Sequence, residues 1–276
     1  MKVCATIAEV RAARPAFPSL GLVPTMGFLH EGHLSLVRAA RANNAGVAAS
    51  LFVNPTQFGP NEDFGRYPRA RDRDLAMLEA AGCDLVFVPE VAEIYPEGFD
   101  TRIEIGGVTS GLEGAVRPGH FAGVATVVAK LFNITTPTRA YFGQKDAQQV
   151  AVIRKLVKDL DMPVEVVVQP TVREADGLAM SSRNAYLDAT ERQDALALWR
   201  ALCAAQVLFE NGERSADGLR AAMAAPIAAI GAAPDYLSVA DPLTLQELET
   251  VGPDGALLSL AVRIGATRLI DNILVN

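Results

Sequence analysis

The sequence predicts an α/β protein with a Rossmann-like, doubly wound parallel sheet followed by a smaller C-terminal α+β domain. In the first 170 residues, short apolar runs alternate with segments whose apolar residues recur at helical spacing, as in parallel sheets with right-handed crossovers. After Pro170, two helical segments precede three strand-like ones, which is typical of a small antiparallel α+β unit. We therefore expect domains at residues 1–170 and 171–276, with a ligand cleft between them.

Each expected element rests on its own apolar pattern. The runs that predict strands of the parallel sheet are residues 20–23, 46–53, 84–88, 139–142 and 164–168. Helical spacing predicts helices at residues 34–43, 71–81, 124–131 and 147–160. In the C-terminal part, helices at 189–210 and 215–230 precede strands at 235–239, 256–262 and 268–270.

Composition narrows the class of protein. The chain has 276 residues, of which 50% are hydrophobic and 21% charged, as is ordinary for a soluble globular enzyme. A net charge of −7 argues against a nucleic-acid or anionic-membrane partner. The N-terminus does not resemble a signal peptide, and no apolar run is long enough to span a bilayer. Three scattered cysteines without a CxxC pair fit a reducing cytoplasm.

The segment PTMGFLHEGH at residues 24–33 joins a predicted strand to a predicted helix. Two glycines allow the backbone to approach a ligand closely, and the free amides of a helix N-terminus favour an anion. Because His30 and His33 are three residues apart, they share one face of the helix. Two imidazoles beside helix amides could stabilise charge that develops on a phosphate.

Two other interpretations of these histidines remain open. Either one could be a structural residue beside an apolar turn. The chain has three histidines, His30, His33 and His120, and three imidazoles form a known kind of catalytic zinc site. Against zinc, the sequence places no partner to fix the ring tautomers, and the glycine-rich turn would be unexplained.

Further polar clusters follow other predicted strands. Asn54 and Gln57 follow the second, and the segment Gly143-Gln144-Lys145-Asp146 follows the fourth. Ligands of open parallel sheets bind at the carboxyl ends of the strands, so these pieces should converge. Lysine could meet a polyphosphate, while the aspartate could hold a ribose hydroxyl or simply cap the next helix. Gln57 and Gln149 could orient a hydroxy acid, although glutamines are more often surface residues.

Two later segments are also candidates. The glycine-rich residues 111–124 could close over a site and deliver Arg117 or His120, or could form a long surface loop. Met180-Ser181-Ser182-Arg183 could bind β- and γ-phosphates from the second domain, or could be an ordinary serine-rich loop. The phosphate-binding motifs GxxxxGK[ST] and GxGxxG and the hydrolase motif GxSxG are absent from the sequence.

The HxGH of residues 30–33 resembles the signature of the nucleotidylyl-transferase superfamily, and the longer PTMGxLHxGH is similar to that of the pantothenate synthetases, the pantoate–beta-alanine ligases. Further matching segments follow in order at residues 52–60, 67–69, 117–124, 143–149 and 173–184, so the resemblance covers essentially the whole chain. Gln144 stands where a glutamate is common and Ala147 where an aromatic residue is common. The first could point its side chain away from ATP, and the second could loosen packing behind the site.

The resemblance implies that pantoate reacts with ATP to give pantoyl adenylate and pyrophosphate, and that beta-alanine then displaces AMP. It implies catalytic roles for His30, His33, Lys145 and Arg183, and substrate contacts for Asn54, Gln57 and Gln149. The residues implied in ATP binding are Met26, Gly27, Phe28, Leu29, His30, Glu31, Gly32, His33, Gly143, Gln144, Lys145, Asp146, Val172, Met180, Ser181, Ser182 and Arg183.

The resemblance further implies that residues 1–170 bind nucleotide and pantoate and that residues 171–276 form a lid. Magnesium would accompany ATP as part of the substrate, with no metal cage and no tightly bound cofactor. The other implied partners are the small molecules pantoate and beta-alanine and a second copy of the chain in a homodimer. Rival hypotheses are another nucleotidylyl transferase, a nucleotide-binding module without turnover, and a zinc hydrolase.

Overall fold

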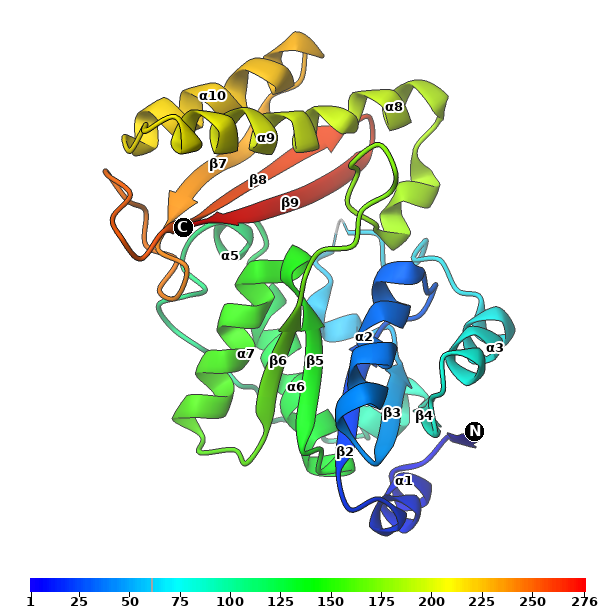
Figure 1. Ribbon diagram of the computed structural model, residues 1–276. Helices are drawn as coiled ribbons and strands as arrows, with labels where there is room; N and C mark the ends of the chain where they lie inside the picture. The colour runs from blue at the N-terminus through cyan, green and yellow to red at the C-terminus, as the bar shows by residue number, and fades with distance from the viewer. Residues whose placement is uncertain (61) are drawn as a thin grey trace.

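The structure, a computed structural model, describes residues 1–60 and 62–276. Within these residues a six-stranded parallel sheet has the order β1-β4-β3-β2-β5-β6 (Figure 1). Its strands are β1 (Lys2–Cys4), β2 (Leu20–Thr25), β3 (Gly46–Leu51), β4 (Leu85–Phe87), β5 (Arg139–Gly143) and β6 (Glu165–Gln169). A Rossmann-like, doubly wound sheet is the predicted fold class, and it is confirmed.

Helices cover both faces of this sheet because alternate side chains of each strand point to opposite faces. The helices of this part are α1 (Ile7–Ala13), α2 (Glu31–Asn43), α3 (Arg71–Ala80), α4 (Val91–Ile94), α5 (Glu113–Val116), α6 (His120–Thr135) and α7 (Ala147–Asp159). On β2, Leu20 and Leu22 join the core under α1, α6 and α7, whereas Val23 joins the core under α2 and α3. Short 3₁₀ turns are η1 (Arg14–Ala16), η2 (Pro55–Gln57) and η3 (Gln144–Asp146). Together these elements form the parallel-sheet unit.

The antiparallel unit follows β6 along the chain. It begins with the 3₁₀ turn η4 (Ser182–Tyr186) and contains α8 (Ala189–Asp194), α9 (Leu196–Glu210), α10 (Ala216–Ala229), β7 (Pro234–Ala240), β8 (Ala256–Ile264) and β9 (Thr267–Val275). Strands β7, β8 and β9 form a meander, and α9 and α10 cover one face of it. The other face lies towards the parallel-sheet unit, above the ends of β5 and α7 (Figure 1). The division of the chain at residues 170 and 171 stays a prediction.

Several predicted boundaries are wrong. The expected helix at 189–210 is two helices, α8 and α9, that meet at the fully buried Ala195. The expected strand at 268–270 is the much longer β9, because the polar Asp271 and Asn272 continue the strand with their side chains buried against other polar groups. Strand β1 is absent from the prediction because it is a short edge strand with two exposed residues. Helix α6 begins at His120 instead of Val124.

In the part of the chain that the structure describes, none of the helices has the length and apolar character that crossing a membrane requires.

Candidate active site

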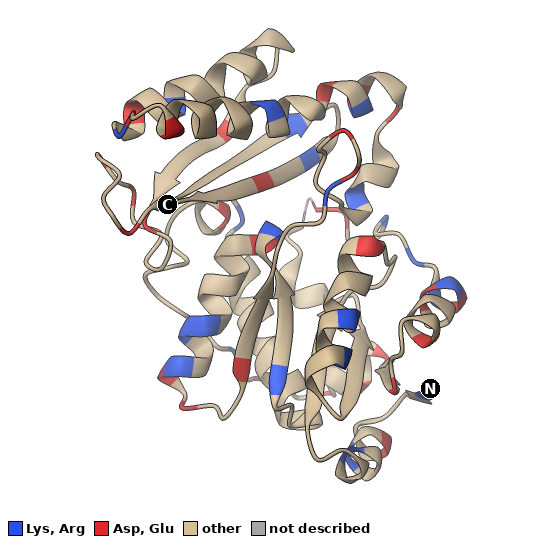
Figure 2. Cartoon of the chain, in the orientation of Figure 1, with Lys and Arg blue, Asp and Glu red and all other residues tan. Residues whose placement is uncertain are grey.

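A cleft of about 1110 Å³ lies between the carboxyl ends of the parallel strands and the antiparallel unit. The sequence segments expected to converge do meet there. Among the predicted residues, those that line the cleft are Met26, His30, Gly32, His33, Asn54, Gln57, Gly143, Lys145, Asp146, Gln149, Val172, Met180, Ser181, Ser182 and Arg183. In Figure 2, charged residues of both signs occur at the facing ends of the two units.

The side chains of some predicted ATP-binding residues are used elsewhere. Leu29 is fully buried in the core under α2, and Phe28 packs against the guanidinium of Arg73. Glu31 is paired with Arg38 on the outside of α2. The side-chain amide of Gln144 donates to Asn272 of β9, as expected for a side chain turned away from ATP. Direct side-chain contacts of these residues with a nucleotide are therefore not favoured in this conformation.

The turn between β2 and α2 is held by a carboxylate from α3. Gly27 and Phe28 have φ angles of 87° and 50°, in the left-handed region. The buried Asp74 accepts hydrogen bonds from the backbone amides of Phe28 at 2.7 Å and Leu29 at 2.8 Å. Arg73 donates to the carbonyl of Leu29 at 2.9 Å. Sequence reasoning missed both residues, although Asp74, four positions before the buried Leu78, lies on the buried face of its helix.

The turn places His30 and His33 at the N-terminus of α2 with ring centroids 4.0 Å apart. The backbone amide of His30 donates to Nδ1 of His33 at 3.3 Å, so the neutral His33 ring carries its proton on Nε2. Burial, followed by the charge of His30, lowers the pKa of His33 to about 3. Burial and the nearby Lys145 lower the pKa of His30 to about 4. Both imidazoles are therefore neutral hydrogen-bonding groups at pH 7 and not cations.

Gly32, between the two histidines, has no room for a side chain. A Cβ atom at Gly32 would lie 2.9 Å from Cε1 of His30. Any side chain here would push the first imidazole out of position, which explains the small residue in the HxGH pattern.

The side chain of Gln57 is held by Asn54, for which the resemblance implies a substrate contact. Asn54 is buried and donates to Oε1 of Gln57 at 3.1 Å and to the carbonyl of Gly123 at 3.2 Å. Its own Oδ1 accepts from Thr56 and, at 2.8 Å, from Tyr95. The hydrogen-bonding capacity of Asn54 is thus used within the protein. This geometry favours a supporting role for Asn54, and its contact with substrate stays a prediction.

His120 lies behind the same turn. Its Nδ1 is 2.8 Å from the carbonyl of Gln57, to which it donates, because Nε2 accepts from Nη1 of Arg117 at 3.0 Å. Burial, followed by the charge of Arg117, lowers the pKa of His120 to about 4. Since both ring nitrogens are engaged, His120 does not form a three-imidazole site with His30 and His33. No group of histidine, cysteine, aspartate and glutamate in residues 1–60 and 62–276 has the arrangement of a metal site.

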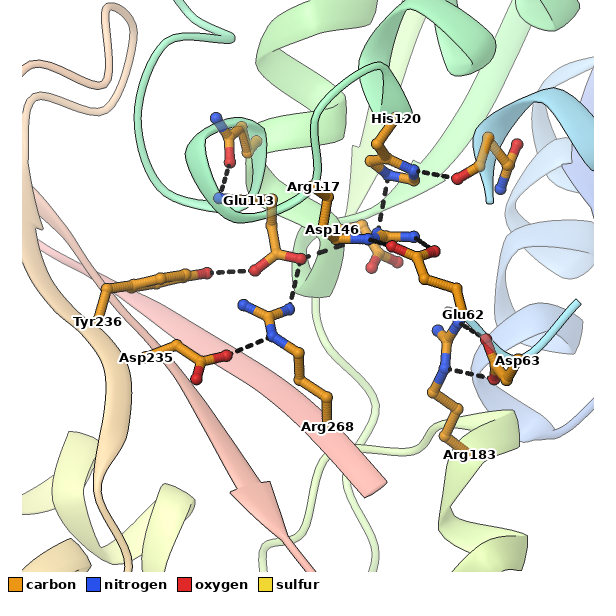
Figure 3. A network of polar contacts seen from close by, with 12 residues as sticks. Glu62, Asp63, Glu113, Arg117, His120, Asp146, Arg183, Asp235, Tyr236 and Arg268 are labelled. Atoms are coloured by element: carbon orange, nitrogen blue, oxygen red, sulfur yellow. Dashed lines mark hydrogen bonds and ion pairs between the residues drawn. The ribbon is translucent and has the colours of Figure 1, made fainter. Parts of the chain in front are cut away.

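Carboxylates hold the arginines of the cleft (Figure 3). Arg183 makes bidentate hydrogen bonds to Asp63, with Nε at 3.0 Å and Nη2 at 2.9 Å. Arg117 binds Glu62 in the same way at 2.8 and 2.6 Å. Burial alone would raise the pKa of Asp63, but its hydrogen bonds to Arg183 lower that pKa overall. A phosphate that binds Arg183 has to replace Asp63 or share the guanidinium with it.

The glycine-rich segment is fastened in place. Glu113 accepts from Tyr236 at 3.0 Å and from Arg268 at 2.6 Å, both of which belong to the antiparallel unit (Figure 3). The backbone amide of Glu113 donates to Gln148 at 2.9 Å, and Gln148 in turn donates to the carbonyls of Val108 and Gly111. In this conformation the segment bridges the two units.

Comparison with known proteins shows the family of this chain. Residues 2–274 match the family described as Pantoate-beta-alanine ligase. The chain belongs to the pantoate-beta-alanine ligase family. Proteins named pantothenate synthetase from Herpetosiphon aurantiacus and Roseiflexus castenholzii are 62% and 64% identical to it, and the matches cover 99% of this chain and at least 98% of each relative.

Solved structures agree with the family assignment. Pantothenate synthetase from Thermus thermophilus superposes with a TM-score of 0.96 at 52% identity, covering 99% of both chains. A pantoate-beta-alanine ligase from Francisella tularensis, described as a complex with beta-gamma ATP and beta-alanine, has a TM-score of 0.81 at 36% identity, covering 99% of this chain and 97% of that one.

Gly32→Ala should separate activity from stability in this ligase. The new methyl group displaces His30, so pantoate-dependent pyrophosphate release should fall by about tenfold or more. Because alanine favours a helix over glycine, the melting temperature should stay the same or rise. Gly252→Ala, at a glycine with open space around it, is the matched control. Full activity in Gly32→Ala would contradict the steric explanation.

The lowered histidine pKa values predict a loss of stability in acid. Between pH 6.5, the ordinary value, and about 4, the unfolded chain binds protons at His30 and His120 that the folded chain does not bind. The contribution of these histidines to the free energy of unfolding should therefore be complete above pH 6.5. It should decrease as the pH drops through this window. Urea unfolding at about pH 7.5 and about pH 5 measures it. His120→Gln should show a smaller difference between the two, and an unchanged difference would contradict the assignment.

Proposed function

We propose that the cleft condenses pantoate with beta-alanine to give pantothenate, with ATP cleaved to AMP and pyrophosphate. The observation that carries this proposal is the meeting of neutral imidazoles, a lysine and the N-terminus of α2 in one cleft, at the carboxyl ends of the strands. Membership of the pantoate-beta-alanine ligase family supports it. The bound molecules named for the Francisella tularensis structure support ATP and beta-alanine as ligands.

In the first step, a carboxylate oxygen of pantoate attacks the α-phosphorus of ATP, the bond from that phosphorus to the bridging β-phosphate oxygen breaks, and pyrophosphate leaves. In the second, the amine of beta-alanine attacks the acyl carbon of the pantoyl adenylate, AMP leaves with the electron pair of the acyl–oxygen bond, and the amine loses a proton. A carboxylate is a poor acyl donor, so adenylation supplies the leaving group. The protein needs no covalent nucleophile.

The catalytic task is then to orient the reactants and to stabilise charge on the transferred phosphate. His33 would donate from Nε2–H to a phosphate oxygen, and His30 lies beside it. Lys145, with a side chain only 19% exposed, would supply the positive charge that the neutral imidazoles do not. Arg183 would bind the leaving pyrophosphate once it is released from Asp63.

The proposal also covers the binding of pantoate and magnesium, the two domains, the oligomeric state and the location. Gln57 and Gln149 would orient pantoate through their amides, with Gln57 also near beta-alanine. Magnesium would enter with the triphosphate as part of the substrate, held mainly by the phosphate oxygens. We also propose that residues 1–170 form the substrate-binding domain and residues 171–276 a lid. We also propose a homodimer, which the resemblance supports, and a cytoplasmic location, which the three scattered cysteines without a CxxC pair support.

An assay in two stages tests the reaction. Protein, ATP, magnesium and pantoate should release pyrophosphate, and AMP should be released when beta-alanine is added. A nucleotidylyl transferase would keep the nucleotide in its product, and a binding module would release no pyrophosphate. A zinc hydrolase would lose its activity with a zinc chelator.

His33→Ala and Lys145→Ala should each slow pantoate-dependent pyrophosphate release by about a hundredfold or more, the usual scale for losing one positioned electrostatic group. Lys155→Ala is the matched control, because Lys155 lies further along the chain on α7, is half-exposed and is paired with Asp159. Its activity should be that of the wild type. Unchanged pyrophosphate release in His33→Ala and Lys145→Ala would remove both residues from the mechanism.

A further inference from the structure

Asn272, in the middle of β9, holds the turn that carries Lys145. Its Nδ2 donates to the carbonyl of Gln144 at 3.1 Å and to the carbonyl of Lys145 itself at 2.8 Å. Its Oδ1 accepts from Nε2 of Gln144 at 3.1 Å. One side chain of the antiparallel unit therefore makes three hydrogen bonds to two consecutive residues of the parallel-sheet unit.

Asn272 lies in a buried, hydrogen-bonded part of β9. Asn272 is 4% exposed and the adjacent Asp271 is 2% exposed. Asp271 accepts a bidentate pair from Arg173, with distances of 2.6 and 2.9 Å, and the Arg173 guanidinium lies 3.8 Å from the centre of the Trp199 ring. These contacts hold β9 at the residue next to Asn272, and the buried amide of Asn272 is held by its own hydrogen bonds to the lysine turn.

The turn itself has few other anchors. η3 is a single 3₁₀ turn between β5 and α7, and the residue before it, Gly143, has no side chain that could cap it. The hydrogen bonds from Asn272 occupy the carbonyls of Gln144 and Lys145, which belong to η3 and lie between the end of β5 and the start of α7. A change at Asn272 should therefore move the backbone from which the lysine side chain extends.

We propose that Asn272 is a positioning residue for Lys145, and that it makes the position of this lysine depend on the seating of the antiparallel unit. This inference rests on the proposed role of Lys145 in adenylation. Closure of the two units and placement of the cation then become one event, because the same strand that covers the cleft holds the turn. Gln144 takes part by donating to Oδ1, which leaves Nδ2 of Asn272 directed at the carbonyls.

A double-mutant cycle tests the inference, with single-turnover pyrophosphate release from ATP and pantoate as the readout. The proteins are the wild type, Asn272→Ala, Lys145→Ala and the double variant. Asn272→Ala should slow pyrophosphate release by about tenfold or more when Lys145 is present. In the Lys145→Ala background the same substitution should slow release by less than about twofold. The KM for beta-alanine should stay unchanged in Asn272→Ala, because the proposed role of the lysine belongs to the first step.

Two further variants distinguish the loss of these hydrogen bonds from a general effect of changing β9 or its neighbour. Asn272→Asp has nearly the same shape but places an oxygen against two carbonyls, and it should lose activity as Asn272→Ala does. Ser259→Ala is the matched control: Ser259 is directly opposite Asn272 in the sheet and buried, and its hydroxyl has no hydrogen-bond partner among the described residues. Ser259→Ala should keep full activity. Melting temperatures identify any variant that fails to fold.

Each outcome has a defined meaning. An equal loss from Asn272→Ala in both backgrounds would show a general structural effect and overturn the positioning role. Full activity in a folded Asn272→Asp would overturn it as well. If Lys145→Ala itself released pyrophosphate at the wild-type rate, the proposed role of the lysine would fail first and this inference would fall with it.

Discussion

The interaction on which the rest of the site depends is the pair of hydrogen bonds from the turn after β2 to the carboxylate of Asp74. Two consecutive residues of this turn have left-handed backbones, a conformation that is costly for phenylalanine and needs support from outside the turn. Asp74 supplies that support from α3. The direction of the turn then decides where α2 begins, and with it where the imidazoles of His30 and His33 lie.

Electrostatics explains how an acidic protein accepts a polyanionic substrate. The net charge is −7, and the imidazoles in the cleft are neutral at pH 7 because burial lowers their pKa values. Positive charge comes from lysine and arginine, and much of it is balanced by carboxylates such as Asp63 and Glu113 in this conformation. Such pairs keep partly buried arginines compensated, and a triphosphate can take over the role of the carboxylate.

The sequence predicts those parts of the site whose information is local. The HxGH turn, the lysine turn and the 180–183 segment follow strands or precede helices, so their place at one edge of the sheet can be inferred. The supporting residues cannot be predicted in this way. Asp74, Tyr95 and Asn272 act through contacts with residues 41 to 128 positions away. The apolar pattern even ends the last strand before Asn272, because burial of this polar side chain depends on the other unit.

If the proposed ligation occurs, a pantoate oxygen becomes bonded to the α-phosphorus of ATP in this cleft. Pantoate labelled with ¹⁸O in its carboxylate reveals this bond, with mass spectrometry of the nucleotide after reaction with ATP and beta-alanine. We expect AMP that carries one ¹⁸O atom, because the bridging oxygen leaves with the phosphate. AMP without the label, or label found in inorganic phosphate released with ADP, would contradict it.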